Sequence, residues 1–478
     1  MSVSSDCSVV TINTVTTALP AYAVEDCGAR PPRYESLRSS RRSTNSSCDT
    51  HQAQNHDPSE GASAGQPQRL GGQQWTTHRL QLKRRWDRAP WVTIRLKSCA
   101  NDAADVPHFC SGSVVKGFIT LDPNSLEQIR SISLQVQGKL VERFQSAGAL
   151  NADNMPARSS TFCEQKDIIW SQSSASKSMA GHHIPFATSF PSSLSANFSV
   201  KGQSARLPPS FEEANSAVAI KYEMVWLFEK NGILTSISRL GIDVTYTPLD
   251  RPEPFSLLRE IAYRNKLAVP DYLADPDGWM SVTFNRAGKI HGKDVMMNGV
   301  LRLPKPLCYT RGYQVPVRLE AAVCSPMTIE PRKLFELQLR RLVHILKPTV
   351  CLKNAREQDY FVMDVKVGCA KWRRVDQMGQ AVRLDGELYV HPQLQPSCFL
   401  PFSAIDYYVS LRPSKVVDIV RTMPSQVTAI VQQPVEVASL LPNGPAPPSY
   451  KGPPTRPKWI TRRNALTESS LFAMSDLL

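Results

Sequence analysis

The sequence lacks the marks of several protein classes. Its 11 cysteines include no Cys-x-x-Cys pair, which argues against a zinc site and a secreted disulfide framework and favours reduced cytosolic thiols. No run reaches about 18 consecutive apolar residues, the length that a membrane-spanning helix needs. The N-terminal MSVSSDCSVV has no basic stretch before an apolar core, unlike a secretory signal. These absences predict a cytoplasmic protein, either soluble or peripheral at the plasma membrane or endosomes.

Signatures of catalysis are also missing. The sequence has no G-x-S-x-G, no phosphate-binding loop and no kinase-like set of motifs. Its acidic residues form no paired pattern for acid–base chemistry. The adjacent His182 and His183 have no cysteine or carboxylate at a spacing that would complete a metal site. We therefore expect no enzyme activity, no cofactor and no metal.

The composition favours β-structure and acidic partners. With 37 prolines, 23 glycines and 8% aromatic residues, the chain fits β-sandwiches flanked by Pro- and Ser-rich arms. A formal charge of +14 suits anionic lipid headgroups, phosphorylated tails or nucleic acid. Nucleic acid is disfavoured, because no groove-binding motif or aromatic stacking platform accompanies the charge.

The clearest strand pattern lies in residues 207–248. Alternate residues from Ile220 to Phe228 are apolar, which is the period of a strand with one buried face. Asn231-Gly232 follows, and both residues tolerate the positive φ of a two-residue hairpin turn. A second run returns from Ile233 to Tyr246. The pattern predicts a long antiparallel hairpin.

A weaker copy of this first strand occurs nearly two hundred residues later. Ala219-Ile220-Lys221-Tyr222 is echoed by Ala404-Ile405-Asp406-Tyr407, and each copy follows a Pro-Ser and a Phe. The echo could be coincidence, since alternating strands reuse few residue types. Its equivalent place in two β-rich blocks instead suggests two related domains.

Shorter runs complete the two blocks and predict an all-β fold. Phe255–Lys266 could form a short helix, and Leu334–Leu346 fits a helix as well as a strand, because its apolar residues do not alternate strictly. The other predicted strands are Trp91–Leu96, Gly112–Leu121, Ser131–Leu140, Phe162–Trp170, Ile184–Pro191, Trp279–Phe284, Asp294–Leu303, Val315–Val323, Tyr360–Val367 and Ala404–Leu411.

Two polar arms flank these blocks, and each holds one Pro-Pro-x-Tyr. Segments this polar cannot bury enough apolar surface to offset their ordering entropy, so we expect disorder. Consecutive prolines favour a polyproline II helix that fits the aromatic-lined groove of a WW domain. Composition alone would yield roughly 0.08 such motifs in the chain. The predicted WW-ligand residues are Pro31, Pro32 and Tyr34 in the first arm and Pro447, Pro448 and Tyr450 in the second.

Taken in order, several segments resemble the arrestin fold. They are Ser111–Gly117, Ile132–Gly138, Ile184–Pro191, Pro208–Phe211 leading into Tyr222, and Tyr246–Pro248. With the flanking motifs, the chain resembles a fungal α-arrestin, an arrestin-related trafficking adaptor. The resemblance implies two immunoglobulin-type β-sandwich domains in tandem. The expected organisation is a disordered arm (1–87), an arrestin N-like sandwich (88–250), a linker (251–277), an arrestin C-like sandwich (278–418) and a disordered Pro-rich arm (419–478).

The resemblance also implies a function. An α-arrestin is a non-catalytic adaptor whose core recognises a plasma-membrane transporter or receptor. Its Pro-Pro-x-Tyr arms recruit a HECT-type ubiquitin ligase through WW domains, and ubiquitination of the cargo drives endocytosis. The alternative is an arrestin-like signalling scaffold, for example in ambient-pH sensing, that links a membrane sensor to endosomal sorting components.

Two further features of the arms suggest regulation. Basic residues beside a Trp could contact an anionic membrane, at about 1 kcal/mol each, or they could belong to a solvated tail or a nuclear-import-like string. Ser43 and Thr44 follow Arg41-Arg42 and resemble basophilic kinase sites, where phosphorylation would invert the local charge. The predicted membrane contacts are Lys83, Arg84, Arg85, Lys458, Arg462 and Arg463.

Overall fold

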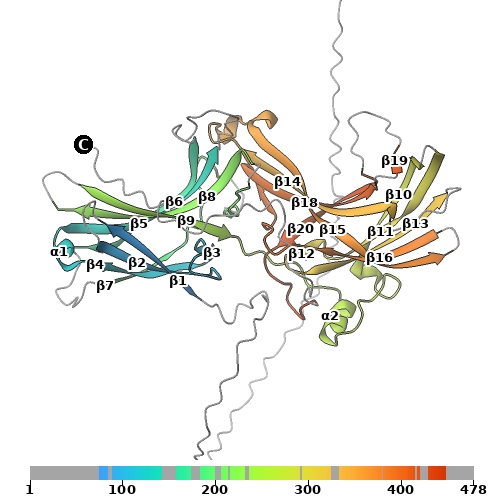
Figure 1. Cartoon of the computed structure of the whole chain (residues 1–478), viewed down its shortest axis with the longest axis horizontal. Helices are drawn as coiled ribbons and strands as arrows, with labels where there is room; N and C mark the ends of the chain where they lie inside the picture. Colours follow the sequence, from blue (N-terminus) through green and yellow to red (C-terminus); the bar gives the residue numbers. More distant parts are fainter. Residues whose placement is uncertain are drawn as a thin grey trace, which may run out of the picture. The chain divides into compact units, whose positions relative to one another are not determined.

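The computed structural model shows that the described residues fold mainly into β-strands (Figure 1). It describes residues 75–83, 89–142, 158–173, 183–199, 206–213, 216–231, 236–290, 293–324, 333–378, 381–414, 417–419 and 429–447. These residues form a first β assembly (76–247) and a second β assembly (279–438), which belong to one compact unit. The all-β prediction is confirmed.

The first β assembly has two layers, whose strands are antiparallel except for the short parallel pair of β3 and β9. A four-stranded sheet in the order β1-β2-β4-β7 faces a five-stranded sheet in the order β3-β9-β8-β5-β6 (Figure 1). Trp91 and Phe186 of the first sheet contact Phe228 and Trp226 of the second, with ring centroids 5.5 and 6.1 Å apart. The elements are β1 (Thr76–Lys83), β2 (Pro90–Ser98), β3 (His108–Cys110), β4 (Val114–Leu121), α1 (Pro123–Leu126), β5 (Ile129–Glu142), β6 (Ser159–Ser171), β7 (His183–Ser189), β8 (Val218–Lys230) and β9 (Ile237–Thr247).

The second β assembly is one sheet folded over on itself. Strand β15 pairs with β14 through its first half and with β16 through its second, so it passes from one layer into the other. Phe284 and Phe335, from opposite layers, meet at 6.4 Å. The elements are α2 (Leu257–Arg264), β10 (Trp279–Ile290), β11 (Lys293–Pro304), β12 (Cys308–Thr310), β13 (Gln314–Cys324), β14 (Phe335–Leu346), β15 (Tyr360–Met378), β16 (Ala381–Tyr389), β17 (Cys398–Leu400), β18 (Ser403–Pro413), β19 (Val417–Ile419) and β20 (Val431–Ala438).

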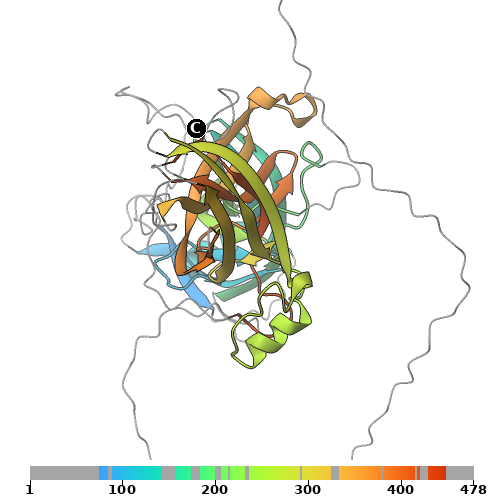
Figure 2. The same ribbon diagram turned by 90° about the vertical axis from the view of Figure 1, so that its right-hand side faces the viewer.

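The two assemblies share one strand topology. The order β1-β2-β4-β7 corresponds to β10-β11-β13-β16, and the order β3-β9-β8-β5-β6 corresponds to β12-β20-β18-β14-β15. The short strands β3 and β12 even make the same parallel pairing, with β9 and β20. The curved sheets of the second assembly are seen from its end in Figure 2.

The sequence echo lies on equivalent strands, β8 and β18. Tyr222 donates its hydroxyl hydrogen to the carbonyl of Pro208 at 2.6 Å, and Tyr407 donates likewise to the carbonyl of Gln395 at 2.7 Å. Both phenols are buried. The preceding loops match as well. The N–H of Ser210 donates to the Tyr246 carbonyl of β9 and its Oγ accepts from the Tyr246 N–H, and Ser397 makes the same two bonds with Val437 of β20.

Two segments assigned to disordered arms are strands instead. Thr76–Lys83 pairs with β2 along its whole length, and Val431–Ala438 pairs with β18 and β12. Both are polar enough overall to resemble an arm. Their apolar residues nevertheless alternate, with Leu80 and Leu82 buried in one and Val435 and Val437 in the other. Only the partner strands supply the burial that orders them.

The hairpin of β8 and β9 is confirmed, but its turn is not where the sequence placed it. Glu229 pairs with Ile237, and the backbone N–H of Lys230 donates to the Ser236 carbonyl. The connection is therefore longer than two residues. Asn231 instead bonds to the segment before β5: its N–H donates to the carbonyl of Gln128 at 2.7 Å. The helix at Leu257–Arg264 is confirmed, and Phe335–Leu346 is a strand.

Candidate functional site

The segment after β20 is fixed against the chain that joins the two assemblies. The backbone N–H of Leu440 donates to the Asp250 carbonyl at 2.9 Å, and its own carbonyl accepts from Thr310 Oγ1 at 2.9 Å. The carbonyl of Leu441 accepts from the guanidinium of Arg251. These bonds direct residues 441–447 toward helix α2 (Figure 1).

Gly444 lies against α2 in a backbone conformation that only glycine adopts easily. Its φ is +116°, a region that a Cβ atom disfavours. A Cβ built there would lie 3.2 Å from Glu260 Oε1 on the helix. The glycine therefore permits both the local path of the chain and its close approach to α2.

Pro447, the first proline of the C-terminal Pro-Pro-x-Tyr, is buried. It lines a pocket with aromatic and proline side chains, among them Phe255, Tyr263, Pro306 and Tyr313. The rings of Phe255 and Tyr263 meet edge to face at 5.2 Å. Burial in this pocket raises the pKa of the Tyr263 phenol above its ordinary value. As in most ligand pockets, the lining is mainly aromatic and apolar with a few polar side chains.

One buried arginine holds α2 in place beside this pocket. Arg259 has no exposed surface, and it donates to the carbonyl of Lys305 at 2.6 Å and to that of Gly278 at 2.7 Å. Its guanidinium also lies 5.3 Å from the ring of Trp279. As a result α2 turns a charged face inward, and Leu257 and Leu258 remain exposed. The apolar periodicity of LLREIAYR would predict the opposite orientation, so the sequence gives no signal for Arg259.

A second buried cation joins the two β assemblies. Arg341 of β14 has no exposed surface and donates through Nη2 to Glu213, which precedes β8, and through Nη1 to Gln395 at 2.7 Å. Around it, Phe402 contacts Phe162 and Phe198, with ring centroids 5.4 and 5.0 Å away. Burial raises the pKa of Glu213, and the charge of Arg341 opposes that rise.

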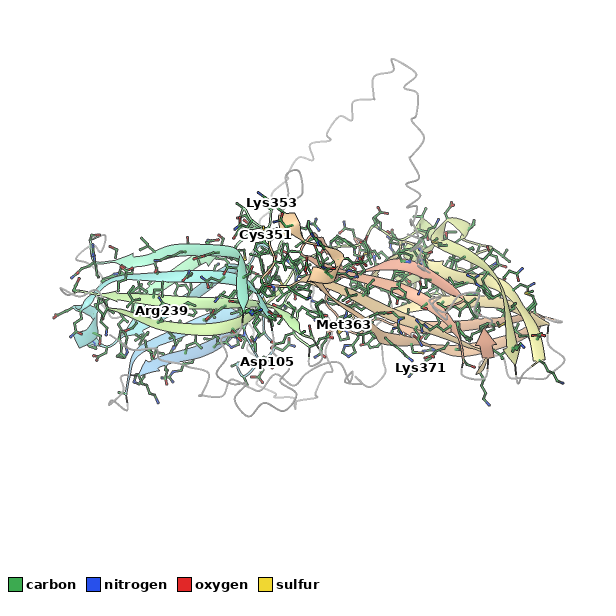
Figure 3. All side chains as sticks on the ribbon, turned by 90° about the horizontal axis from the view of Figure 1, so that it is seen from above. Asp105, Arg239, Cys351, Lys353, Met363 and Lys371 are labelled. Carbon is green, nitrogen blue, oxygen red and sulfur yellow. The ribbon has the colours of Figure 1, made fainter. Side chains whose placement is uncertain are left out.

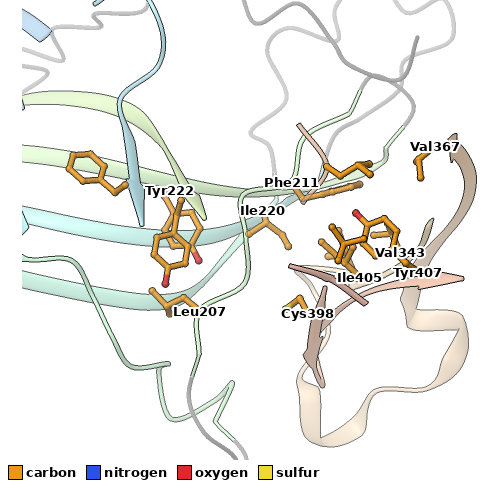
Figure 4. Packing of buried hydrophobic residues seen from close by; sticks show 14 of the residues in the cluster. Leu207, Phe211, Ile220, Tyr222, Val343, Val367, Cys398, Ile405 and Tyr407 are labelled. Atoms are coloured by element: carbon orange, nitrogen blue, oxygen red, sulfur yellow. The ribbon is translucent and has the colours of Figure 1, made fainter. Parts of the chain in front are cut away.

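Apolar packing surrounds this ion pair. Phe211, Ile220, Val343, Ile405 and Tyr407 are buried in one cluster (Figure 4). Phe211 also forms a bridge to Ile220 and lies 5.5 Å from the Arg341 guanidinium. The sequence predicted the strands here but not the pairing of Glu213 with Arg341, since nothing local marks two residues far apart in the chain as partners.

Two of the residues predicted from sequence to contact partners are described. Pro447 is buried beside α2, and Lys83 is exposed at the end of β1, so they lie on different elements. Other charged side chains that point outward include Arg239, Lys353 and Lys371 (Figure 3). The predicted residues outside the described part of the chain are Pro31, Pro32, Tyr34, Ser43, Thr44, Arg84, Arg85, Pro448, Tyr450, Lys458, Arg462 and Arg463.

Three titratable side chains of the fold, one histidine and two cysteines, are held in their neutral forms by burial. Burial lowers the pKa of His108 to about 4 and raises that of Cys110 to about 11 and that of Cys398 to about 12. Such thiols are protonated at neutral pH and are poor nucleophiles. Of the histidine pair, His183 bonds through Nδ1 with Thr120 Oγ1 at 2.9 Å, and His182 lies outside the described residues. Among those residues, no group of three or more His, Cys, Asp or Glu could hold a metal ion.

Comparison with known proteins adds no relative. The sequence matches no protein-family model, and no curated protein is significantly similar to it. In the described parts of the chain, no helix is long and apolar enough to cross a membrane.

Proposed function

We propose that this protein is a non-catalytic adaptor that brings a WW-domain HECT-type ubiquitin ligase to plasma-membrane transporters or receptors. The observation that carries the proposal is the pair of Pro-Pro-x-Tyr motifs, one before and one after the β assemblies. Each motif offers a WW groove a polyproline ridge followed by a tyrosine.

The β assemblies suit the cargo-binding role in this proposal. Their duplicated topology is compatible with the tandem arrestin-like domains that the sequence resemblance implies. Their exposed strands and loops supply an extended surface for the cytoplasmic part of a membrane protein. The Arg341–Glu213 pair and the packing of Phe402 connect the two assemblies and would keep such a surface in one shape.

Two motifs on one chain also suit a ligase that has several WW domains. Once the first motif binds, the second is presented at an effective concentration set by the chain between them, so the pair binds more tightly than either motif alone. The ligase then supplies the ubiquitin-transfer chemistry, and the adaptor supplies the choice of cargo.

A census of membrane proteins tests the proposal in cells. We expect Tyr34→Ala/Tyr450→Ala to stabilise the same transporters at the plasma membrane as deletion of the protein. Tyr22→Ala, which removes a tyrosine outside both motifs, should leave their turnover unchanged. Stabilisation of a single sensor with no transporter would instead support the signalling-scaffold alternative, and no change in any membrane protein would refute both.

A further inference from the structure

The C-terminal Pro-Pro-x-Tyr begins inside the folded protein. Pro447 is buried and forms part of the wall of the pocket that Phe255, Tyr263 and Tyr313 also line. The chain just before it is held by the hydrogen bonds of Leu440 and by the close approach of Gly444 to α2. The first residue of the motif is thus packed into the folded protein and is not a free ligand.

This arrangement conflicts with binding to a WW domain. A WW groove grips proline rings between its own aromatic side chains, whereas Pro447 is already buried in the folded protein beside Phe255, Tyr263 and Tyr313. A buried proline ring is not accessible to a WW groove. Pro447 must leave its place in the folded protein before the WW groove can close on it.

We infer that the packing of Pro447 beside α2 is an internal contact that withholds the first residue of the C-terminal Pro-Pro-x-Tyr, and that WW domains compete with this contact. The inference rests on the proposed function, because it assumes that the motif is a WW ligand. The two motifs are then unequal, because the C-terminal motif can bind a WW domain fully only after Pro447 is released from the folded protein. A ligase bound through the N-terminal motif would supply the local concentration that drives this exchange.

The expected size of the effect follows from the population of the released state. When the binding-competent state is a minor fraction, the apparent dissociation constant rises by the reciprocal of that fraction. An internal contact of Pro447 that is formed about nine-tenths of the time weakens WW binding by about tenfold. We expect a difference of this order between the intact chain and a peptide of residues 443–455.

The chain offers a matched pair of variants at the approach to the pocket. Gly444→Ala adds a Cβ at a φ of +116° and 3.2 Å from Glu260 Oε1, so it should displace residues 444–447 without changing the side chains of Phe255, Tyr263 and Tyr313. Asn443→Ala changes the neighbouring exposed residue and should leave the segment in place. Tyr34→Ala in every chain limits binding to the C-terminal motif.

The test is titration of these chains and of the peptide with a single WW domain of a HECT-type ligase. We expect the Tyr34→Ala chain to bind about tenfold more weakly than the peptide, Gly444→Ala to restore the peptide's affinity, and Asn443→Ala to change nothing. Equal affinity of the Tyr34→Ala chain and the peptide would overturn the inference, as would a Gly444→Ala chain that still binds weakly.

Trypsin cleavage after Lys451 separates this inference from the proposed function, because it requires no WW domain. Gly444→Ala should accelerate that cleavage severalfold, with Asn443→Ala as the control. Failure of the peptide to bind the WW domain would refute the part of the proposed ligase recruitment that is assigned to the C-terminal motif, while faster cleavage would still support the internal contact of Pro447. If Gly444→Ala leaves the rate of cleavage after Lys451 unchanged, the internal contact of Pro447 is refuted, whatever the result of the WW titration.

Discussion

Removal of Arg341 should destabilise the protein more than any surface substitution. Its guanidinium is fully buried between the two assemblies and donates to Glu213, which is 4% exposed, and to Gln395. Arg341→Met keeps much of the side-chain volume and removes the charge. A buried carboxylate then has lost its cation, and loss of one partner of a buried ion pair costs about 3 to 5 kcal/mol.

The loss of unfolding free energy in Arg341→Met should increase with pH. Burial already raises the pKa of Glu213, and Arg341 restrains that rise. Without Arg341, the folded pKa moves further above the unfolded value of about 4.3. The folded variant then holds a proton that the unfolded chain releases, so its stability falls as pH increases through this interval. The deficit relative to the wild-type protein should therefore be larger at pH 8 than at pH 5.

Urea unfolding followed by tryptophan fluorescence measures the deficit. A loss of about 3 to 5 kcal/mol lowers the midpoint by about 1 to 2 M urea for a slope of about 2.5 kcal/mol per molar. Arg340→Met is the matched control, because the neighbouring Arg340 pairs with the partly exposed Asp364 and should cost about 1 kcal/mol or less. Arg341→Met/Glu213→Leu should recover most of the loss, since an apolar pair of similar volume replaces the ion pair.

Two results would refute this reasoning. One is an Arg341→Met protein whose stability lies within 1 kcal/mol of the wild type. The other is a double variant no more stable than the single one, which would mean that the cost comes from lost packing rather than from the stranded Glu213.

Further predictions concern the duplicated loops and the arms. Tyr222→Phe and Tyr407→Phe each remove an equivalent buried hydrogen bond and should each cost about 1 kcal/mol in unfolding free energy; costs that differ severalfold would argue against equivalent roles. Alanine at Lys83, Arg84 and Arg85 should weaken co-sedimentation with anionic vesicles at low salt by about a hundredfold, at about 1 kcal/mol per residue. The pair Lys97→Ala/Lys116→Ala is the control, and an undiminished signal in the triple variant would exclude these residues from membrane contact.

Much of the fold could be predicted because its strands alternate. Alternate apolar residues from Ile220 to Phe228 mark β8, and the Tyr222–Tyr407 echo placed β8 and β18 at equivalent positions in a repeated topology. Strands β1 and β20 escaped prediction because they are polar overall and become ordered through partners distant in the sequence. The pattern of apolar residues within one strand does not reveal which distant strand it will pair with.

The candidate site was less predictable, for a related reason. The sequence marked Pro447 as part of a WW ligand, but its burial depends on Gly444, Phe255 and Tyr263, which come together only in the fold. Helix α2 buries Arg259 and leaves its leucines exposed, because the guanidinium donates hydrogen bonds to two backbone carbonyls. Periodicity places an arginine outside by default, so the exposed Leu257 was not expected.

The most direct test of the adaptor account is retention of the purified chain on immobilised tandem WW domains of a HECT-type ligase. Four chains are needed: wild type, Tyr34→Ala, Tyr450→Ala and the double variant. The account predicts weaker retention of each single variant and no retention of the double variant. Retention of the double variant at the wild-type level would contradict it.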